Sequence, residues 1–222
     1  MSIDRTRPLL CFVHSVSDLV PALGLIERGR GAWGSLDIVQ VRGKDLPADD
    51  LEKMVAAWID MVASQSTLIV VNDRLDVTLA AGADGVHVGR QDLPAEQIRE
   101  KAPEDLVVGV STHDRQEVLL AQGAGASYAG FGAFFESRTK PEARVLDRRK
   151  AGLMEPIPAL TIPVVAIGGI TAGRVAEVLS MPPVTGVAVG AAIQRADGPA
   201  EAVEELRAAI DRAWMERPEH AL

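Results

Sequence analysis

Residues 68–92 read LIVVNDRLDVTLAAGADGVHVGRQD, and this stretch decides the fold. It holds two short apolar runs, Leu68–Val71 and Gly85–Val88, separated by a segment with a helix-like pattern. Continuous apolar runs of this length are typical of strands with both faces buried, as in a parallel sheet. The stretch therefore predicts a strand–helix–strand unit with two parallel, neighbouring strands.

An aspartate lies just beyond each of these strands. Asp73 follows Asn72, and Asp92 comes nineteen residues later. Because parallel neighbours end at the same edge of a sheet, both carboxylates should emerge on one face. Paired hard oxygens suit Mg²⁺, especially Mg²⁺ carrying a phosphorylated substrate, so Asp73 and Asp92 are predicted metal ligands. Asp92, just before Leu93 and Pro94, also fits a helix cap, which is compatible with metal binding.

The same alternation continues along the chain. It predicts a single-domain α/β protein, a (β/α)₈ TIM barrel over residues 1–222 with a frayed tail at 215–222. A doubly wound open sheet is disfavoured because no Gly-rich dinucleotide fingerprint follows an early strand. The expected strands are Leu9–Val13, Ile38–Val41, Leu68–Val71, Gly85–Val88, Leu106–Val110, Tyr128–Phe131, Ile162–Ile167 and Gly186–Val189.

Composition narrows the function classes. The 222 residues are 47% hydrophobic, and the net charge of −8 argues against a nucleic-acid surface. No run approaches the ~20 apolar residues of a membrane span, so a soluble, cytoplasmic protein is expected. The single cysteine, Cys11, lies in an apolar run and is expected to be a buried hydrophobe. A homo-oligomer is compatible with the sequence, which carries no signal for subunit number.

Polar side chains follow several other strands, at the end where barrel enzymes place their sites. Gln40, Arg42 and Lys44 alternate along an extended segment, where two cations and an amide can grip a pyrophosphate. The alternative is a solvated strand end. Ser111 could donate to a phosphate, and His113 is either a general acid/base or the start of a helix.

His87, inside a strand, is expected to be a core or supporting histidine rather than a metal ligand. On a later charged loop, Ser137, Thr139 and Lys140 suit closure over a phosphate ester, although a plain surface loop has the same composition.

Glycine-containing turns follow the seventh and eighth strands, at Gly168-Gly169 and Gly190-Ala191. Backbone N–H groups at this place form the phosphate site of many barrels. Together the loops predict a Mg²⁺-dependent enzyme with a pyrophosphate site and a monophosphate site. That combination suggests a transferase that joins a pyrophosphate donor to a phosphorylated acceptor.

In combination these motifs resemble the thiamine phosphate synthase superfamily, which also contains the thiazole tautomerases. The resemblance spans about Ile38 to Ile193. It rests on residues 40–44 (QVRGK), 72–74 (NDR), 84–89 (DGVHVG) with Asp92, 109–113 (GVSTH), 132–140 and 166–170 (AIGGI).

The resemblance implies coupling of hydroxymethylpyrimidine diphosphate to thiazole phosphate, giving thiamine phosphate and pyrophosphate. Asp73 and Asp92 would hold the metal that neutralises the leaving group. Catalytic roles are implied for Arg42, Lys44, Ser111 and Lys140. Substrate binding is implied for Gln40, Asn72, Ser137, Thr139, Gly169, Gly190 and Ala191.

Two positions depart from the synthase pattern. Gly43 stands where the synthases usually carry a polar residue. Arg90 stands where they usually carry glutamine, and an arginine at this position resembles the pattern of the tautomerase branch. A tautomerase needs no metal pair and would use His113 for proton transfer. A third alternative is a non-catalytic barrel that binds thiazole phosphate. The presence of both acids favours the synthase, because pyrophosphate departure requires a metal.

Overall fold

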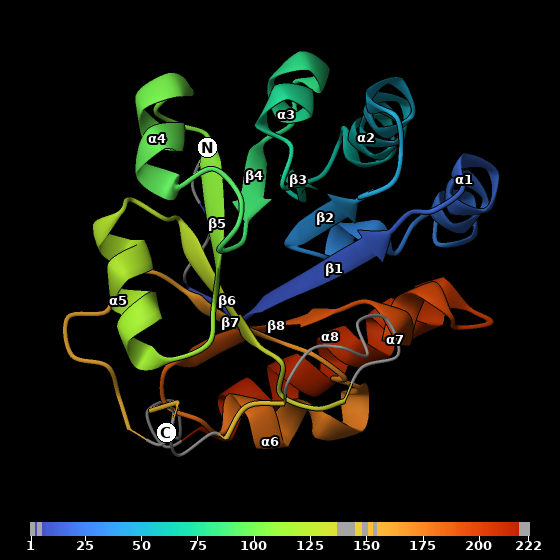
Figure 1. Ribbon diagram of the computed structural model, residues 1–222. Helices are drawn as coiled ribbons and strands as arrows, with labels where there is room; N and C mark the ends of the chain where they lie inside the picture. The colour runs from blue at the N-terminus through green and yellow to red at the C-terminus, as the bar shows by residue number, and fades with distance from the viewer. Residues whose placement is uncertain (1–2, 4–5, 137–144, 148–150, 153–154, 218–222) are drawn as a thin grey trace.

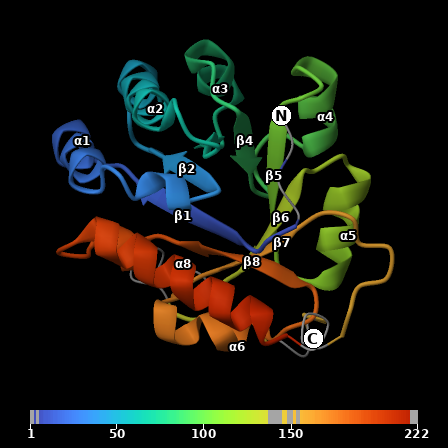
Figure 2. The ribbon, with the colours of Figure 1, turned by 180° about the vertical axis from the view of Figure 1, so that it is seen from behind.

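The protein folds into a closed barrel of eight parallel strands in the order β1 to β8, with helices outside it (Figures 1 and 2). The computed structural model describes residues 3, 6–136, 145–147, 151–152 and 155–217. The strands are β1 (Leu9–Ser15), β2 (Ile38–Arg42), β3 (Leu68–Asn72), β4 (Gly85–Val88), β5 (Val107–Thr112), β6 (Tyr128–Gly132), β7 (Val164–Ile167) and β8 (Val184–Val189). The α-helices are α1 (Leu19–Arg28), α2 (Ala48–Val62), α3 (Leu75–Ala81), α4 (Ala95–Lys101), α5 (Arg115–Gly123), α6 (Val175–Leu179), α7 (Ala191–Gln194) and α8 (Pro199–Met215), with short 3₁₀ turns η1 (Trp33–Ser35) and η2 (Ala172–Arg174). The predicted barrel is confirmed.

The strand limits differ slightly from those expected. β7 begins at Val164 rather than at Ile162, because Pro163 has no N–H for the strand ladder and contributes only its carbonyl, which accepts from the Ala129 N–H at 2.9 Å. β5 runs on to Thr112. Among the described residues, no helix combines the length and apolar character needed to cross a membrane.

The last helix and the two residues after it are in contact with the barrel as far as Arg217. α8 continues to Met215, and the Arg217 guanidinium donates to the carbonyls of Val184 at 2.7 Å and Pro182 at 2.9 Å. These two bonds hold Arg217 against the barrel, and fraying of the tail at 215–222 stays a prediction. Residues 218–222 lie outside the described part.

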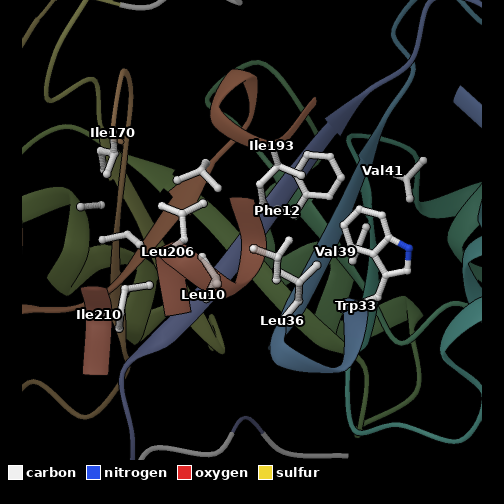
Figure 3. Packing of buried hydrophobic residues seen from close by; sticks show 14 of the residues in the cluster. Leu10, Phe12, Trp33, Leu36, Val39, Val41, Ile170, Ile193, Leu206 and Ile210 are labelled. Carbon is white, nitrogen blue, oxygen red and sulfur yellow. The ribbon is translucent and has the colours of Figure 1, made fainter. Parts of the chain in front are cut away.

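Both faces of the strands are buried, which explains their unbroken apolar runs. Along β1, Leu9, Cys11 and Val13 belong to the cluster inside the barrel. Leu10 and Phe12 belong to the larger cluster between barrel and helices (Figure 3). Cys11 is a free, buried thiol, as expected. The alternation fixes which side chains at each strand's carboxyl end face the barrel axis.

An aromatic cluster fills the layer between β1, η1 and α2. Phe12 stacks on Trp33 with ring centroids 5.9 Å apart, and Trp33 meets Trp58 edge-on at 5.0 Å. The Trp58 indole N–H donates to His14 Nδ1 at 3.0 Å, so the single ring proton of neutral His14 lies on Nε2. Burial lowers the pKa of His14 to about 4. The cluster therefore holds His14 in its neutral form.

This burial makes the protein sensitive to acid. An unfolded histidine titrates near 6.5, whereas His14 in the fold titrates at about 4. Below pH 6.5 the unfolded state takes up a proton that the folded state refuses, so stability falls between pH 6.5 and 4, by roughly 3 kcal/mol for one such group. Urea unfolding of the wild type at pH 7.5 and 5.0, compared with His14→Gln, measures this. The variant should lose less stability between the two pH values, and equal losses would contradict the assignment.

Candidate active site

The predicted metal and anion residues come together at the carboxyl ends of β2 to β5. Arg42 and Asn72 are the last residues of β2 and β3, and Asp73 follows Asn72 directly. Asp92 lies between β4 and α4. These neighbouring strands run in the same direction, so their ends share one edge of the barrel (Figure 1).

The two aspartates converge as predicted. The pKa of Asp73 is raised, first by burial and then by the neighbouring Asp92 carboxyl group. Lys44 and Arg42 act in the opposite direction on the same pKa. Two acids in one half-buried place repel each other when ionised, and a bound cation relieves that repulsion. The donor set thus fits a hard divalent ion.

Backbone geometry holds each carboxylate in place. Asp73 has a left-handed φ of 67°, which is uncommon outside glycine, and its N–H donates to the His87 carbonyl on β4 at 2.8 Å. Asp92 Oδ2 accepts from the Gly89 N–H at 2.7 Å. The helix-cap alternative for Asp92 is not observed, since α4 has Pro94 at its N-cap position.

The described residues contain no group of three or more His, Cys, Asp or Glu side chains that could together hold a metal ion. Water and substrate oxygens are suited to complete the shell of a cation held by Asp73 and Asp92. That is the usual arrangement for Mg²⁺ on a phosphorylated substrate.

The pyrophosphate triplet lies beside the acids. Gln40 Nε2 donates to Asn72 Oδ1 at 2.7 Å, which fixes both amides. Lys44 Nζ lies 3.7 Å from Asp73 Oδ2. Lys44 is 55% exposed, so its ammonium group can also reach a ligand from solvent. Predicted anion-binding and metal-binding side chains are thus in contact with each other.

A polar row crosses the barrel interior next to the acids. Ser111 Oγ lies 2.9 Å from His87 Nε2, and His87 Nδ1 lies 2.9 Å from the Tyr128 hydroxyl. Burial lowers the pKa of His87 to about 4, so the ring is neutral. A Cβ on Gly130 would come within 2.9 Å of His87 Cε1, and one on Gly109 would overlap the ring. His87 is therefore a satisfied supporting residue, as predicted, and it sets the position of Ser111.

The role of Tyr128 was missed from the sequence. Its signal is the register, which aligns His87, Gly109 and Tyr128 across three strands. The glycine on the middle strand lets the two rings meet.

His113 and Arg90 share one partner. Glu117, in the first turn of α5, accepts from the His113 N–H at 2.7 Å and lies 3.0 Å from its Nδ1. The other Glu117 oxygen pairs with Arg90. Glu117 also completes the helix cap, because its N–H donates to the Asp114 side chain at 2.9 Å. His113 thus precedes a helix start, one of its two expected roles, and Arg90 is directed toward α5. Glu117 was not among the predicted residues.

The glycine turns after β7 and β8 lie where the sequence placed them. Gly168 and Gly169 have φ of 106° and 62°, a backbone path that L side chains rarely adopt. Gly190 is the N-cap residue of α7, whose first residue is Ala191. The remaining predicted residues, Ser137, Thr139 and Lys140, lie outside the described residues.

Comparisons with known proteins identify the family of this chain. The family model described as "Thiamine monophosphate synthase" matches residues 27–193. A thiamine-phosphate synthase of Chlorobium phaeovibrioides is 37% identical over 90% of this chain and 93% of its own length. One from Pyrococcus abyssi is 40% identical over 80% and 84%, respectively. The solved thiamine phosphate pyrophosphorylase of Pyrococcus furiosus superposes with a TM-score of 0.81 at 32% identity, covering 94% of this chain and 98% of that one. The chain belongs to the thiamine monophosphate synthase family.

Proposed function

We propose that this chain is a thiamine phosphate synthase, which couples hydroxymethylpyrimidine diphosphate to thiazole phosphate and releases pyrophosphate. The observation that carries the proposal is the gathering of two acids and two cations at one edge of the barrel: Asp92 raises the pKa of Asp73, Arg42 and Lys44 oppose it, and Lys44 Nζ lies 3.7 Å from Asp73 Oδ2. Together with family membership, this arrangement supports a site for a metal-bound pyrophosphate. The substrates are then small phosphorylated molecules, and the cytoplasm is the proposed location.

Asp73 and Asp92 would hold the Mg²⁺. When bound, Mg²⁺ supplies positive charge that stabilises the leaving pyrophosphate. Arg42 and Lys44 add charge to the same leaving group, and Lys140 is proposed to do so from the later loop. As the bond between the pyrimidine methylene carbon and the diphosphate oxygen breaks, the electron pair leaves with pyrophosphate.

The pyrimidine cation left behind accepts the lone pair of the thiazole nitrogen, which forms the new carbon–nitrogen bond. Asn72, fixed by Gln40, and Ser111, fixed by His87, would orient the pyrimidine. The thiazole phosphate would bind the turns at Gly169 and at Gly190-Ala191, together with Ser137 and Thr139. In this scheme the protein contributes charge and orientation rather than a covalent intermediate.

The tautomerase alternative depends on His113 as a proton carrier. Glu117 contacts both the backbone and the ring of this residue. A tautomerase would also leave the Asp73–Asp92 pair without a role. The acid pair therefore favours the synthase, whereas the Glu117 contact is compatible with either chemistry, because a carboxylate at histidine Nδ1 is also how a general base is oriented.

The direct test supplies both substrates with and without Mg²⁺ and measures thiamine phosphate and pyrophosphate. We expect both products in equal amounts, only with Mg²⁺ and only when both substrates are present. Full turnover in excess chelator would show that the reaction does not need Mg²⁺ and would contradict the proposed metal site. Absence of turnover at every Mg²⁺ concentration would favour the non-catalytic barrel.

Asp73→Asn should raise the Mg²⁺ concentration needed for half-maximal rate and lower kcat/KM by roughly 100-fold, since it removes one of two charged ligands. Asp76→Asn is the matched control, because Asp76 is an exposed aspartate nearby that pairs with Arg74. The control should stay within about twofold of wild type. Equal effects of the two substitutions would refute a metal role for Asp73.

Ser111→Ala should lower kcat/KM for the pyrimidine diphosphate by roughly tenfold, about the cost of one lost hydrogen bond in a buried site. Tyr128→Phe leaves Ser111 in place but frees His87 Nδ1, so a smaller loss is expected together with a lower Tm. If Tyr128→Phe costs more activity than Ser111→Ala, Ser111 is not the residue that contacts the substrate.

His113→Gln separates the two chemistries. Under the proposed function the synthase rate should stay within about threefold, because the substituted side chain takes no part in pyrophosphate departure. The same variant should be assayed for aromatisation of a thiazole carboxylate phosphate. A metal-independent activity of that kind in the wild type, abolished in His113→Gln, would replace the synthase by the tautomerase.

A further inference from the structure

Arg174 makes two contacts that link the loops after β6 and β7. Its Nη1 donates to the Gly169 carbonyl at 2.7 Å. Its guanidinium carbon lies 4.4 Å from the centroid of the Phe135 ring. Gly169 belongs to the turn after β7, whereas Phe135 follows the end of β6. One exposed arginine at the end of η2 therefore connects both segments.

The two segments are also joined through their backbones. The Phe134 N–H donates to the Ile167 carbonyl at 2.9 Å, and the Phe135 N–H donates to the Gly168 carbonyl at 3.0 Å. A Cβ on Gly168 would come within 2.7 Å of the Ala133 Cβ, and one on Gly169 within 2.8 Å of the Phe135 Cβ. The glycines are thus required for close approach as well as for their positive φ.

We propose that Arg174 is a positioning residue that holds the Gly168–Gly169 turn in its phosphate-binding conformation by fixing it against Phe135. The inference rests on the proposed function, because that function assigns the acceptor phosphate to this turn. It adds a residue that touches neither substrate but determines how tightly the thiazole phosphate binds.

The geometry explains how a contact on one side of the turn acts on the other. In a trans peptide the carbonyl and the following N–H point in opposite directions. Arg174 holds the Gly169 carbonyl, so the Ile170 N–H of the same peptide group points away from Arg174. Without the bond, this peptide group loses one of its restraints, and glycine, which has no Cβ, restrains ψ on the Gly169 side only weakly.

The chemistry of the contact requires arginine. A planar guanidinium can stack on an aromatic face while its edge donates a hydrogen bond. The lysine ammonium group is compact and cannot cover the Phe135 ring and reach the Gly169 carbonyl in the same way. Arg174→Lys therefore keeps the charge but loses the arrangement.

The first test is steady-state kinetics with each substrate varied in turn. Arg174→Ala and Phe135→Leu should each raise KM for thiazole phosphate by roughly fivefold and leave KM for the pyrimidine diphosphate within twofold. The double variant should be no worse than Arg174→Ala, because the arginine substitution already removes the contact with Phe135. Arg174→Lys should resemble Arg174→Ala. Arg212→Ala, which removes an exposed arginine from α8, is the control and should match wild type.

A direct phosphate ligand would behave differently. It would be rescued by lysine and unaffected by Phe135→Leu, and that combination of results would overturn the positioning role. So would a rise in both KM values together, which would indicate general loosening of the site.

The second test does not depend on turnover. Hydrogen exchange at the Phe134 and Phe135 amides should be several-fold faster in Arg174→Ala than in wild type or Arg212→Ala. Unchanged exchange would overturn the proposal even if the KM values shift. If the wild type makes no thiamine phosphate, the proposed function fails, and the exchange result still decides whether Arg174 holds the turn.

Discussion

The pairing of β1 with β8 closes the barrel, and closure brings the turns after β7 and β8 to the same rim as the acids that follow β3 and β4. Leu9 lies opposite Gly186 in the register, where a Cβ on the glycine would come within 2.7 Å of the Leu9 Cβ. At the amino end of the strands, Asp37 accepts from the Leu10 N–H at 2.7 Å and pairs with Arg7 and Arg207. Toward the other end, the Gln194 amide exchanges two hydrogen bonds with the Ser15 backbone. Closure places all the carboxyl ends of the strands around one rim.

That rim concentrates charge of both signs in a small space. Asp92 lies close enough to Asp73 to raise its pKa, and Lys44 and Arg42 partly compensate. Such a cluster contributes little to stability, since exposed or strained ion pairs are weak. Its arrangement is better explained by a ligand that carries both a cation and phosphate groups. The neutral row of Ser111, His87 and Tyr128 lies beside it and supplies hydrogen bonds without further charge.

The parts of the structure that follow from local pattern were predictable. Unbroken apolar runs identified the strands, and parallel pairing brought Asp73 and Asp92 together although nineteen residues separate them. Partners set by the register were not predictable, because they depend on which residues lie opposite on the neighbouring strands. The contact between His87 and Tyr128 needs Gly109 between them. Glu117 and Arg174 resemble ordinary helix-end charges until their partners are known.

The aromatic layer outside β1 has a practical consequence for spectroscopy. Of the three tryptophans, Trp33 and Trp58 are fully buried in that layer. The third, Trp214, lies in the last turn of α8 and packs against Arg217, which follows the helix. None of them belongs to the residues assigned to the metal or phosphate sites. Intrinsic indole emission will therefore follow the integrity of the outer shell. Ligand titrations at the rim that rely on fluorescence therefore call for a label, since the tryptophans are placed to observe unfolding rather than ligand binding.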